Sequence, residues 1–472
     1  RPRIGANEPP LVPYRFPIIG HTYSFSHDTG NFLKKCKETY GEPFSLYIFG
    51  SVRTFTGVDS THEVLRNSEI FDFYAGANKL LPVGDVFRTF IKNNPTSYIA
   101  RMVHEQVSGK INIYTSRLQN ELLFGIDKFF GDCKGTFSRI IAKPVANVIL
   151  GEECAQYEDI ITSFSVVENE LQKMRFVPRT LSFIHPSLHK FFVTLPLKFG
   201  WNPISRHRDL FVQRCKPIIE ERIRQRKELG EEYIQKEDLL DFFISESEKD
   251  VLDNEYMNKI FVVLYQIVFA SINYSGRPEL WNEIYEEQLK IHNESNGILS
   301  TEDVNKMVKL DCFLKESFRY SADPAGLPHT LVSDSYTFSN GTTIPKGRDV
   351  YLYMKDTAFN NRFFGETSND FQPNRHITSY RDGKIIHSPA TRVDKSFITF
   401  GGGKHACPGR VFAVTEIKMC LHKLILRYKI RTESGKIEPP RVLSLATFPS
   451  IAGLIFENHW ISLFTSADIN IL

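Results

Sequence analysis

The sequence lacks any long hydrophobic run. No stretch of about 18 or more uncharged apolar residues occurs in its 472 residues, so nothing in it predicts a membrane-spanning helix. An excess of charge is missing too, because 58 basic side chains stand against 55 acidic ones and the basic residues form no long run. Nucleic acid is therefore not an expected partner.

Cysteine pairs of the CxxC type are also absent. Seven cysteines, an odd number placed far apart, argue against a disulfide framework and against a zinc site. The chain is therefore expected in a reducing compartment. The seven are Cys36, Cys133, Cys154, Cys215, Cys312, Cys407 and Cys420.

The pattern along the chain predicts a mainly α fold with a small β portion. Residues 42–58 and 335–354 have the aromatic and β-branched content of strands, and most of the sequence between them is helical in pattern. A helix is expected over 208–229, ending at Gly230, and another over 300–320 with Ser300 as its N-cap. Because the strands fall near both ends of the chain, we expect one interleaved domain over residues 1–472.

Two segments raise the question of a membrane surface. Residues 1–20 form a basic, proline-rich stretch that resembles a hinge after a removed N-terminal anchor, which we treat as a hypothesis. Residues 176–200 are rich in Phe, Leu and Val with scattered basic residues. They form either a buried hydrophobic segment or a surface that enters the membrane interface.

The most specific motif is "FITFGGGKHACPGRVFAVTEIK", residues 397–418. Consecutive glycines at 401–403 leave the backbone free to approach something flat and large. Cys407 follows them just before a helical run, where the helix dipole and backbone amides favour a thiolate.

This loop resembles the cysteine-ligand loop of the cytochrome P450 family, through Phe400, Gly401, Gly403, His405, Cys407 and Gly409. The family's ExxR pair is matched by Glu316 and Arg319, and the later segment "DFQPNRHI" supplies Arg375 for its buried Glu-Arg-Arg network. These motifs follow one another in the family's order. The resemblance extends over nearly the whole chain and includes fungal members as well as the sterol 7α-hydroxylase and prostacyclin synthase branch.

The resemblance implies a cofactor, haem b, with the Cys407 thiolate as the proximal ligand of its iron. Phe400 would pack beside the sulfur, while His405 and His329 stand where relatives often place arginines for the haem propionates. The family's tryptophan and arginine on an earlier helix are not found. Tyr98 and Arg101 are candidates for that role, although an exposed helix face explains them equally well.

The apolar run "IFVVLYQIV" (260–268) matches the family's distal helix, whose oxygen-binding motif falls on Ala270, Ser271, Asn273 and Tyr274. The motif's threonine is replaced by Tyr274, with Ser275 next to it. Gly276 and Pro278 then stop the helix earlier than in relatives. Either the chain naturally lacks a segment between Ser275 and Gly276, or the sequence given skips one.

The resemblance implies a monooxygenase that acts on a lipophilic molecule such as a sterol, terpenoid or fatty acyl compound. Its electrons would come from NADPH through NADPH-cytochrome P450 reductase, and the monomeric enzyme would sit on the cytoplasmic face of the endoplasmic reticulum membrane. Two alternatives stay open. One is a haem-thiolate isomerase or dehydratase that needs no reductase, and the other is a non-catalytic haem or lipid binding protein.

Overall fold

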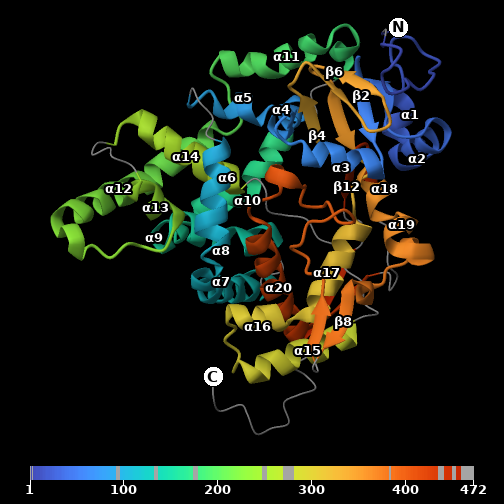
Figure 1. Cartoon of the computed structure of the whole chain (residues 1–472). Coiled ribbons are helices and arrows are strands. Elements are labelled where there is room, and N and C mark those ends of the chain that lie inside the picture. Colours follow the sequence, from blue (N-terminus) through green and yellow to red (C-terminus); the bar gives the residue numbers. More distant parts are fainter. Residues whose placement is uncertain are drawn as a thin grey trace.

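The computed structural model describes residues 2, 4–91, 96–131, 137–173, 179–246, 252–268, 281–381, 384–433, 441–448 and 453–458. Most of these residues are helical, as the sequence predicts (Figure 1). The α-helices are α1 Thr22–His27, α2 Thr29–Tyr40, α3 Val58–Arg66, α4 Phe73–Leu80, α5 Val83–Phe87, α6 Thr96–Met102, α7 Ile111–Gly131, α8 Phe137–Leu150, α9 Glu152–Ala155, α10 Glu158–Lys173, α11 Pro186–Lys198, α12 Ser205–Leu229, α13 Leu239–Ser245, α14 Asn254–Val268, α15 Trp281–Glu294, α16 Thr301–Lys306, α17 Val308–Tyr320, α18 Met354–Ala358, α19 Asn361–Phe364 and α20 Arg410–Arg427.

The shorter helical pieces include one π-helix, Val103–Ser108, which continues α6. The 3-10 turns among the described residues are Arg179–Phe183, Gly230–Glu232, Gly365–Asn369, Pro373–His376 and Gly403–His405. In the part of the chain that is described, no helix combines the length and the apolar character needed to cross a membrane.

The largest sheet has five strands in the order β1-β2-β7-β4-β3 and joins the two halves of the sequence. Strand β2 runs parallel to β7 with Thr54 opposite Val350, and β4 lies antiparallel to β7. Smaller two-stranded sheets complete the β portion. The strands are β1 Phe44–Ile48, β2 Ser51–Thr56, β3 Phe71–Asp72, β4 Gly326–Leu331, β5 Ser335–Thr337, β6 Thr343–Pro345, β7 Asp349–Leu352, β8 Ile377–Arg381, β9 Lys384–His387, β10 Tyr428–Thr432, β11 Arg441–Leu443, β12 Ala446–Phe448 and β13 Leu454–Asn458.

Both predicted helix boundaries are confirmed, but one of the two predicted helices is interrupted. Helix α12 ends before Gly230, whose φ of 53° suits a residue without a Cβ, so that boundary is confirmed. Ser300 caps α16, with its hydroxyl accepting from the Asp303 amide, which confirms the cap. The single helix expected over 300–320 is wrong, however. Met307 has a ψ of 66°, and a second helix, α17, begins after it.

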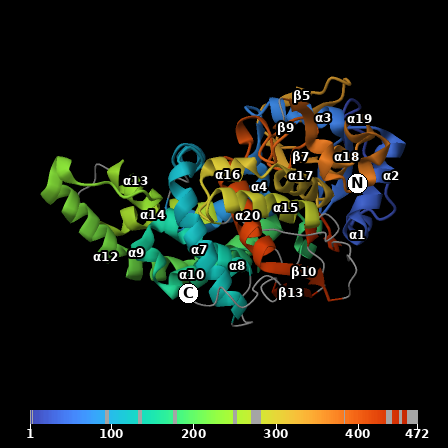
Figure 2. The same cartoon turned by 90° about the horizontal axis from the view of Figure 1, so that it is seen from below.

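Helix α20 follows the cysteine loop and lies near the centre of the molecule (Figure 1). Its apolar residues belong to one core cluster with α7, α15 and α17, including Leu118, Ile284, Leu310 and Met419. Helices α12, α13 and α14 form a lobe on the opposite side from the main sheet (Figure 2). The cysteine loop therefore sits where the helical core meets the sheet-bearing half.

The amino-terminal segment contacts the main sheet at Val12, and the hinge hypothesis for residues 1–20 stays a prediction. Val12 is 5% exposed, and its amide donates to the carbonyl of Ser45 in β1 at 3.0 Å. The described part of 176–200 forms a turn and α11, which leave Ile184 and Phe199 75% and 82% exposed. The buried interpretation of that segment is thus wrong for these side chains, although Val193 is buried.

Candidate functional site

The loop before α20 is folded back on itself so that Cys407 lies opposite Phe400. The Cys407 amide donates to the Phe400 carbonyl at 2.8 Å, and the Gly401 amide donates to Ile398 at 2.9 Å. Gly401 has a φ of 76° and Gly403 a φ of 58°, both in the left-handed region. The glycines predicted from the motif therefore close a tight turn that L side chains would strain.

Helix α3 and the π-helix hold this loop from two sides. A Cβ on Gly403 would collide with the backbone carbonyl of Leu65, at the end of α3. From the π-helix, the Ser108 hydroxyl donates to the Pro408 carbonyl at 2.7 Å. A Cβ on Gly409 would make only an ordinary contact, with Val103. Ser108 carries no motif signal in the sequence, so sequence reasoning missed it.

The Cys407 thiol is partly buried and surrounded by donors. Burial raises its pKa, while the backbone amides of Gly409 and Arg410 and the positive charge of Arg410 lower it. The net shift of the Cys407 pKa is upward, because burial outweighs these groups. The Arg410 guanidinium also donates to the Cys407 carbonyl at 2.9 Å, which ties the loop to the first turn of α20.

His329 and His405 lie close together, with ring centroids 6.1 Å apart. His405 donates from Nε2 to the Ser68 carbonyl at 3.0 Å, and His329 donates from Nδ1 to the Leu327 carbonyl at 2.7 Å, because carbonyls only accept. Burial lowers the pKa of His329 to about 4. In each ring, one nitrogen is therefore occupied by a hydrogen bond to a backbone carbonyl.

Helix α4 brings further residues to these histidines that the sequence analysis missed. The ring of Tyr74 packs edge-on against His405 at 5.6 Å, and Phe73 lies 5.6 Å from His329. Gly76 makes this possible, because a Cβ there would collide with the backbone of Pro328. Only a weak indication of this close packing is present in the sequence, a single glycine, Gly76, within a short helical pattern.

Glu316, Arg319 and Arg375 meet in one buried network. Glu316 accepts from Arg319 at 2.7 and 2.8 Å and from Arg375 at 3.1 Å. Arg319 also donates to the backbone carbonyls of Ala358, Ser368 and Asp370. His376, which the sequence analysis did not single out, joins them with its Nε2 2.9 Å from Glu316.

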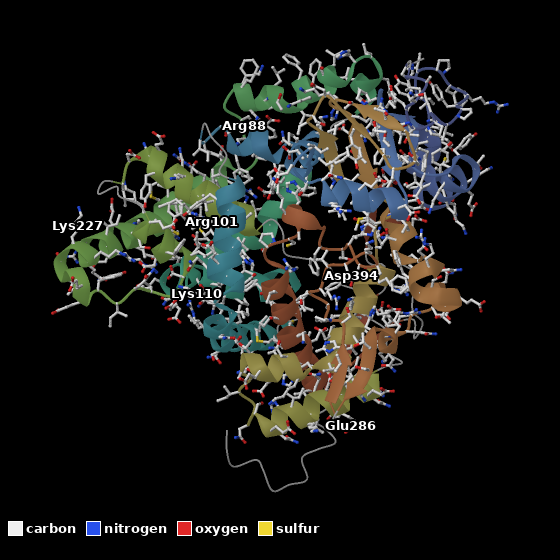
Figure 3. All side chains as sticks on the ribbon, viewed as in Figure 1. Arg88, Arg101, Lys110, Lys227, Glu286 and Asp394 are labelled. Carbon is white, nitrogen blue, oxygen red and sulfur yellow. The ribbon has the colours of Figure 1, made fainter. Side chains whose placement is uncertain are left out.

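Phe400 and Arg101 lie in different surroundings. The Phe400 ring packs edge-on against Phe318 at 5.6 Å, so it belongs to the core behind the loop. Arg101 is exposed on α6, with its guanidinium 5.7 Å from the centre of the Tyr98 ring (Figure 3). Tyr98 in turn donates to Glu246 at 2.7 Å. Contact of Arg101 with a cofactor stays a prediction.

The four distal positions fall outside the described residues. Helix α14 is described up to Val268, and Ala270, Ser271, Asn273 and Tyr274 follow it. The predicted break between Ser275 and Gly276 lies in the same part of the chain. Among the described residues of α14, Tyr265 is 1% exposed and its hydroxyl lies 2.9 Å from the Ser163 hydroxyl.

Comparison with known proteins gives one family. The family model described as Cytochrome P450 matches residues 9–452. Cytochrome P450 monooxygenase 71 of Postia placenta is 30% identical over 237 residues, which is 48% of this chain and 47% of that protein. This chain thus matches about half the length of that relative.

Two other relatives are matched over more of their length. Cytochrome P450 monooxygenase 151 of Postia placenta is 27% identical over 371 residues, 75% of this chain and 71% of that protein. Lanosterol 14-alpha demethylase of Candida tropicalis is 24% identical over 488 residues, 93% of this chain and 88% of that protein.

Proposed function

The chain belongs to the cytochrome P450 family, whose members bind haem iron, and we propose that it is a haem-thiolate monooxygenase. Its substrate would be a lipophilic small molecule of the sterol, terpenoid or fatty acyl class. The observation that carries this proposal is the glycine-turned loop that presents Cys407 at the start of α20, with the Gly409 and Arg410 amides acting on its sulfur.

The residues present fit a haem iron better than a bare metal ion. In the described part of the chain, no group of three or more His, Cys, Asp or Glu side chains is placed to hold a metal. A single cysteine ligand therefore suits an iron whose remaining protein-independent ligands come from a macrocycle. A coordinating metal deprotonates its thiol, which overcomes the burial that otherwise keeps the pKa of Cys407 high.

Backbone amides and two histidines of the chain would each have a separate role around the cofactor. Haem bound through a thiolate supplies an electron-rich iron that favours O–O bond cleavage. The amides of Gly409 and Arg410 would orient the sulfur and moderate its charge. His329 and His405 would lie beside the propionates, with Nδ1 of His329 and Nε2 of His405 held by backbone carbonyls.

We assign Glu316, Arg319 and Arg375 a structural role behind the site, as the buried network between α17 and the segment that follows residue 365. The distal wall is assigned to Ala270, Ser271, Asn273 and Tyr274 on sequence alone. The absence of threonine at Tyr274 keeps a reductase-independent isomerase or dehydratase as the second candidate.

An exposed apolar face supports association of the enzyme with a membrane surface. It comprises Phe16, Ile18, Tyr23, Ile184, Phe191, Phe192, Phe199 and Trp201, each at least 44% exposed. The turn between β1 and β2 joins its two parts, since the Phe49 amide donates to Thr22 at 2.9 Å and the Phe49 ring packs against Phe183. Both parts lie at the same end of the molecule (Figure 1). A membrane-bound NADPH-cytochrome P450 reductase would be the electron donor.

Two measurements test the proposal. The reduced, haem-loaded protein with carbon monoxide is expected to show the red-shifted Soret band of a thiolate ligand. Cys407→Ser should abolish that band, while Cys36→Ala, a buried cysteine in α2, should keep it. Haem binding without the thiolate band would contradict the assignment. Turnover that depends on NADPH and reductase supports the monooxygenase, and turnover of a peroxide substrate without them supports the isomerase.

A further inference from the structure

Two histidine rings meet between α15 and α20, about 18 Å along the axis of α20 from its first turn. The ring centroids of His292 and His422 are 5.7 Å apart. His422 is fully buried and His292 is half-buried. Each ring keeps one buried nitrogen without a hydrogen-bond partner, Nδ1 in His292 and Nε2 in His422. Buried polar atoms without partners are rare and point to a ligand or an ordered water. Helices α15 and α20 lie side by side in both views (Figures 1 and 2).

The neighbours of His422 determine which of its nitrogens carries the proton. Glu287 accepts from the backbone amides of Lys309 at 2.7 Å and Leu310 at 3.0 Å, so both its oxygens act as acceptors. The Gln288 amide nitrogen donates to Glu287 at 3.0 Å, which turns the Gln288 oxygen toward His422 Nδ1 at 2.8 Å. Nδ1 is therefore the donor, and Nε2 of the neutral ring bears a lone pair.

Burial disfavours the protonated form of both rings. Burial, together with the nearby charge of Lys423, lowers the pKa of His422 to about 3 and also lowers that of His292. Metal ligation requires the neutral imidazole, so these pKa shifts keep the ligand form available. A metal-binding histidine also typically donates its other N–H to an oxygen acceptor, as His422 does to Gln288.

We propose that His292 and His422 together bind a divalent transition-metal ion of the zinc class, with water completing its coordination. Zn–N bonds of about 2.0–2.1 Å place two imidazoles on one ion with their centres roughly 5–6 Å apart, in line with the observed spacing. No third His, Cys, Asp or Glu joins them among the described residues, so this is an open, two-imidazole site.

One positive charge opposes the ion. Lys423, the residue after His422, donates from its amine to the Gly297 carbonyl at 3.2 Å, beside the His292 ring. Its charge repels a cation, so the site has moderate affinity, and Lys423→Met should tighten binding. The ion would contact one residue of α15 and one of α20. Its binding should therefore stabilise the packing of these two helices and raise the thermal midpoint.

The experiment uses the haem-loaded full chain, so that Cys407 is occupied, after removal of adventitious metal with a chelator. Equilibrium dialysis against Zn²⁺ should show one bound ion per chain that His292→Gln removes. Gln288→Leu, which takes away the acceptor for His422, should weaken binding about 10- to 100-fold. The matched control, His27→Gln on the exposed surface of α1, should bind like the wild type.

A second readout separates a bound ion from a buried water. Zn²⁺ should raise the thermal midpoint of the wild type and of His27→Gln, and should leave that of His292→Gln unchanged. The haem spectrum of each variant reports that it has folded. Equal Zn²⁺ binding by the wild type and His292→Gln would place the ion at another site, and no binding by the wild type would indicate a water-filled site. Either result would overturn the proposal.

Discussion

A single buried carboxylate, Glu316, connects α17 to the segment that precedes the cysteine loop. Burial alone would raise its pKa, but hydrogen bonds from Arg319 and His376 and from the Gln372 amide outweigh burial and bring the pKa to about 2. The Glu316 carboxylate in the folded protein therefore stays ionised at every pH at which it is ionised in the unfolded chain.

We expect Glu316→Gln to destabilise the protein by about 3–5 kcal/mol at pH 7, because it leaves the buried Arg319 and the partly buried Arg375 without their counter-charge. The ionised Glu316 contributes stability above its unfolded pKa near 4.5, and this contribution is lost as the pH falls toward 2. Urea unfolding from pH 3 to 7 should therefore show a steeper acid loss in the wild type than in the variant.

The control for this experiment is the exposed pair Arg362–Asp59, with both side chains 64% exposed. Asp59→Asn should leave the urea midpoint close to that of the wild type, because solvent screens such pairs. If Glu316→Gln lowered the urea midpoint no more than Asp59→Asn does, the ion pairs of Glu316 would contribute no more stability than an exposed surface pair.

Sequence motifs identified three members of this network but not the fourth. Glu316 and Arg319 are separated by one helical turn, and Arg375 follows in a segment with its own motif, so their meeting was predictable. His376 has no such signal, because its role depends on how the turn after Pro373 aims the side chain at Glu316. In the same way, Ser108 became relevant only because the π-helix packs on Pro408.

At the scale of elements, the cysteine loop depends on its close approach to α3. Gly403→Ala would combine a φ of 58° with a collision against the Leu65 carbonyl. We expect a loss of about 1–3 kcal/mol in stability and faster release of haem, measured by thermal unfolding and by haem transfer to an acceptor protein.

Gly341→Ala is the matched variant, since it has a φ of 86° but no atom within 4 Å of the added Cβ. It shares the backbone strain and lacks the collision, and it lies in the turn between β5 and β6. If both variants release haem equally fast, backbone strain rather than the contact with α3 explains the effect.

Element boundaries show where pattern reasoning stops. Gly230 and Ser300 were readable as a helix end and a helix start because local backbone chemistry determines them. The break at Met307 was not, because the amides that open α17 find their acceptor in Glu287, on a different helix. A helix boundary that depends on a residue from another helix cannot be predicted from the local sequence pattern.

For the whole molecule, the mainly α fold and the family were predictable because several motifs recur in one order. The exposure of Ile184, Phe199 and Trp201 was not, since an apolar segment suits a core and a membrane surface equally well. The structure places Phe199 and Trp201 82% and 64% exposed, beyond the end of α11. Large apolar groups left in water at one end of the molecule favour a lipid surface.

We therefore expect the protein to bind phospholipid vesicles and the double variant Phe199→Asp, Trp201→Asp to bind them at least roughly 100-fold more weakly. Each aromatic side chain transferred from water contributes about 1.5–3 kcal/mol, and the pair thus accounts for two decades in the partition coefficient. Because both side chains are exposed, the substitutions should leave the thermal midpoint and the haem spectrum unchanged. Vesicle sedimentation measures the partition.

Ile234→Asp is the control for this experiment, because Ile234 is 87% exposed but lies between α12 and α13 in the lobe away from the main sheet. If any exposed apolar side chain promoted vesicle binding, Ile234→Asp would also bind vesicles more weakly than the wild type. Binding that depends on Phe199 and Trp201 but not on Ile234 orients the molecule with α11 and the β1–β2 turn toward the lipid. Equal loss in both variants would instead indicate non-specific adsorption and remove the main support for a membrane-facing surface.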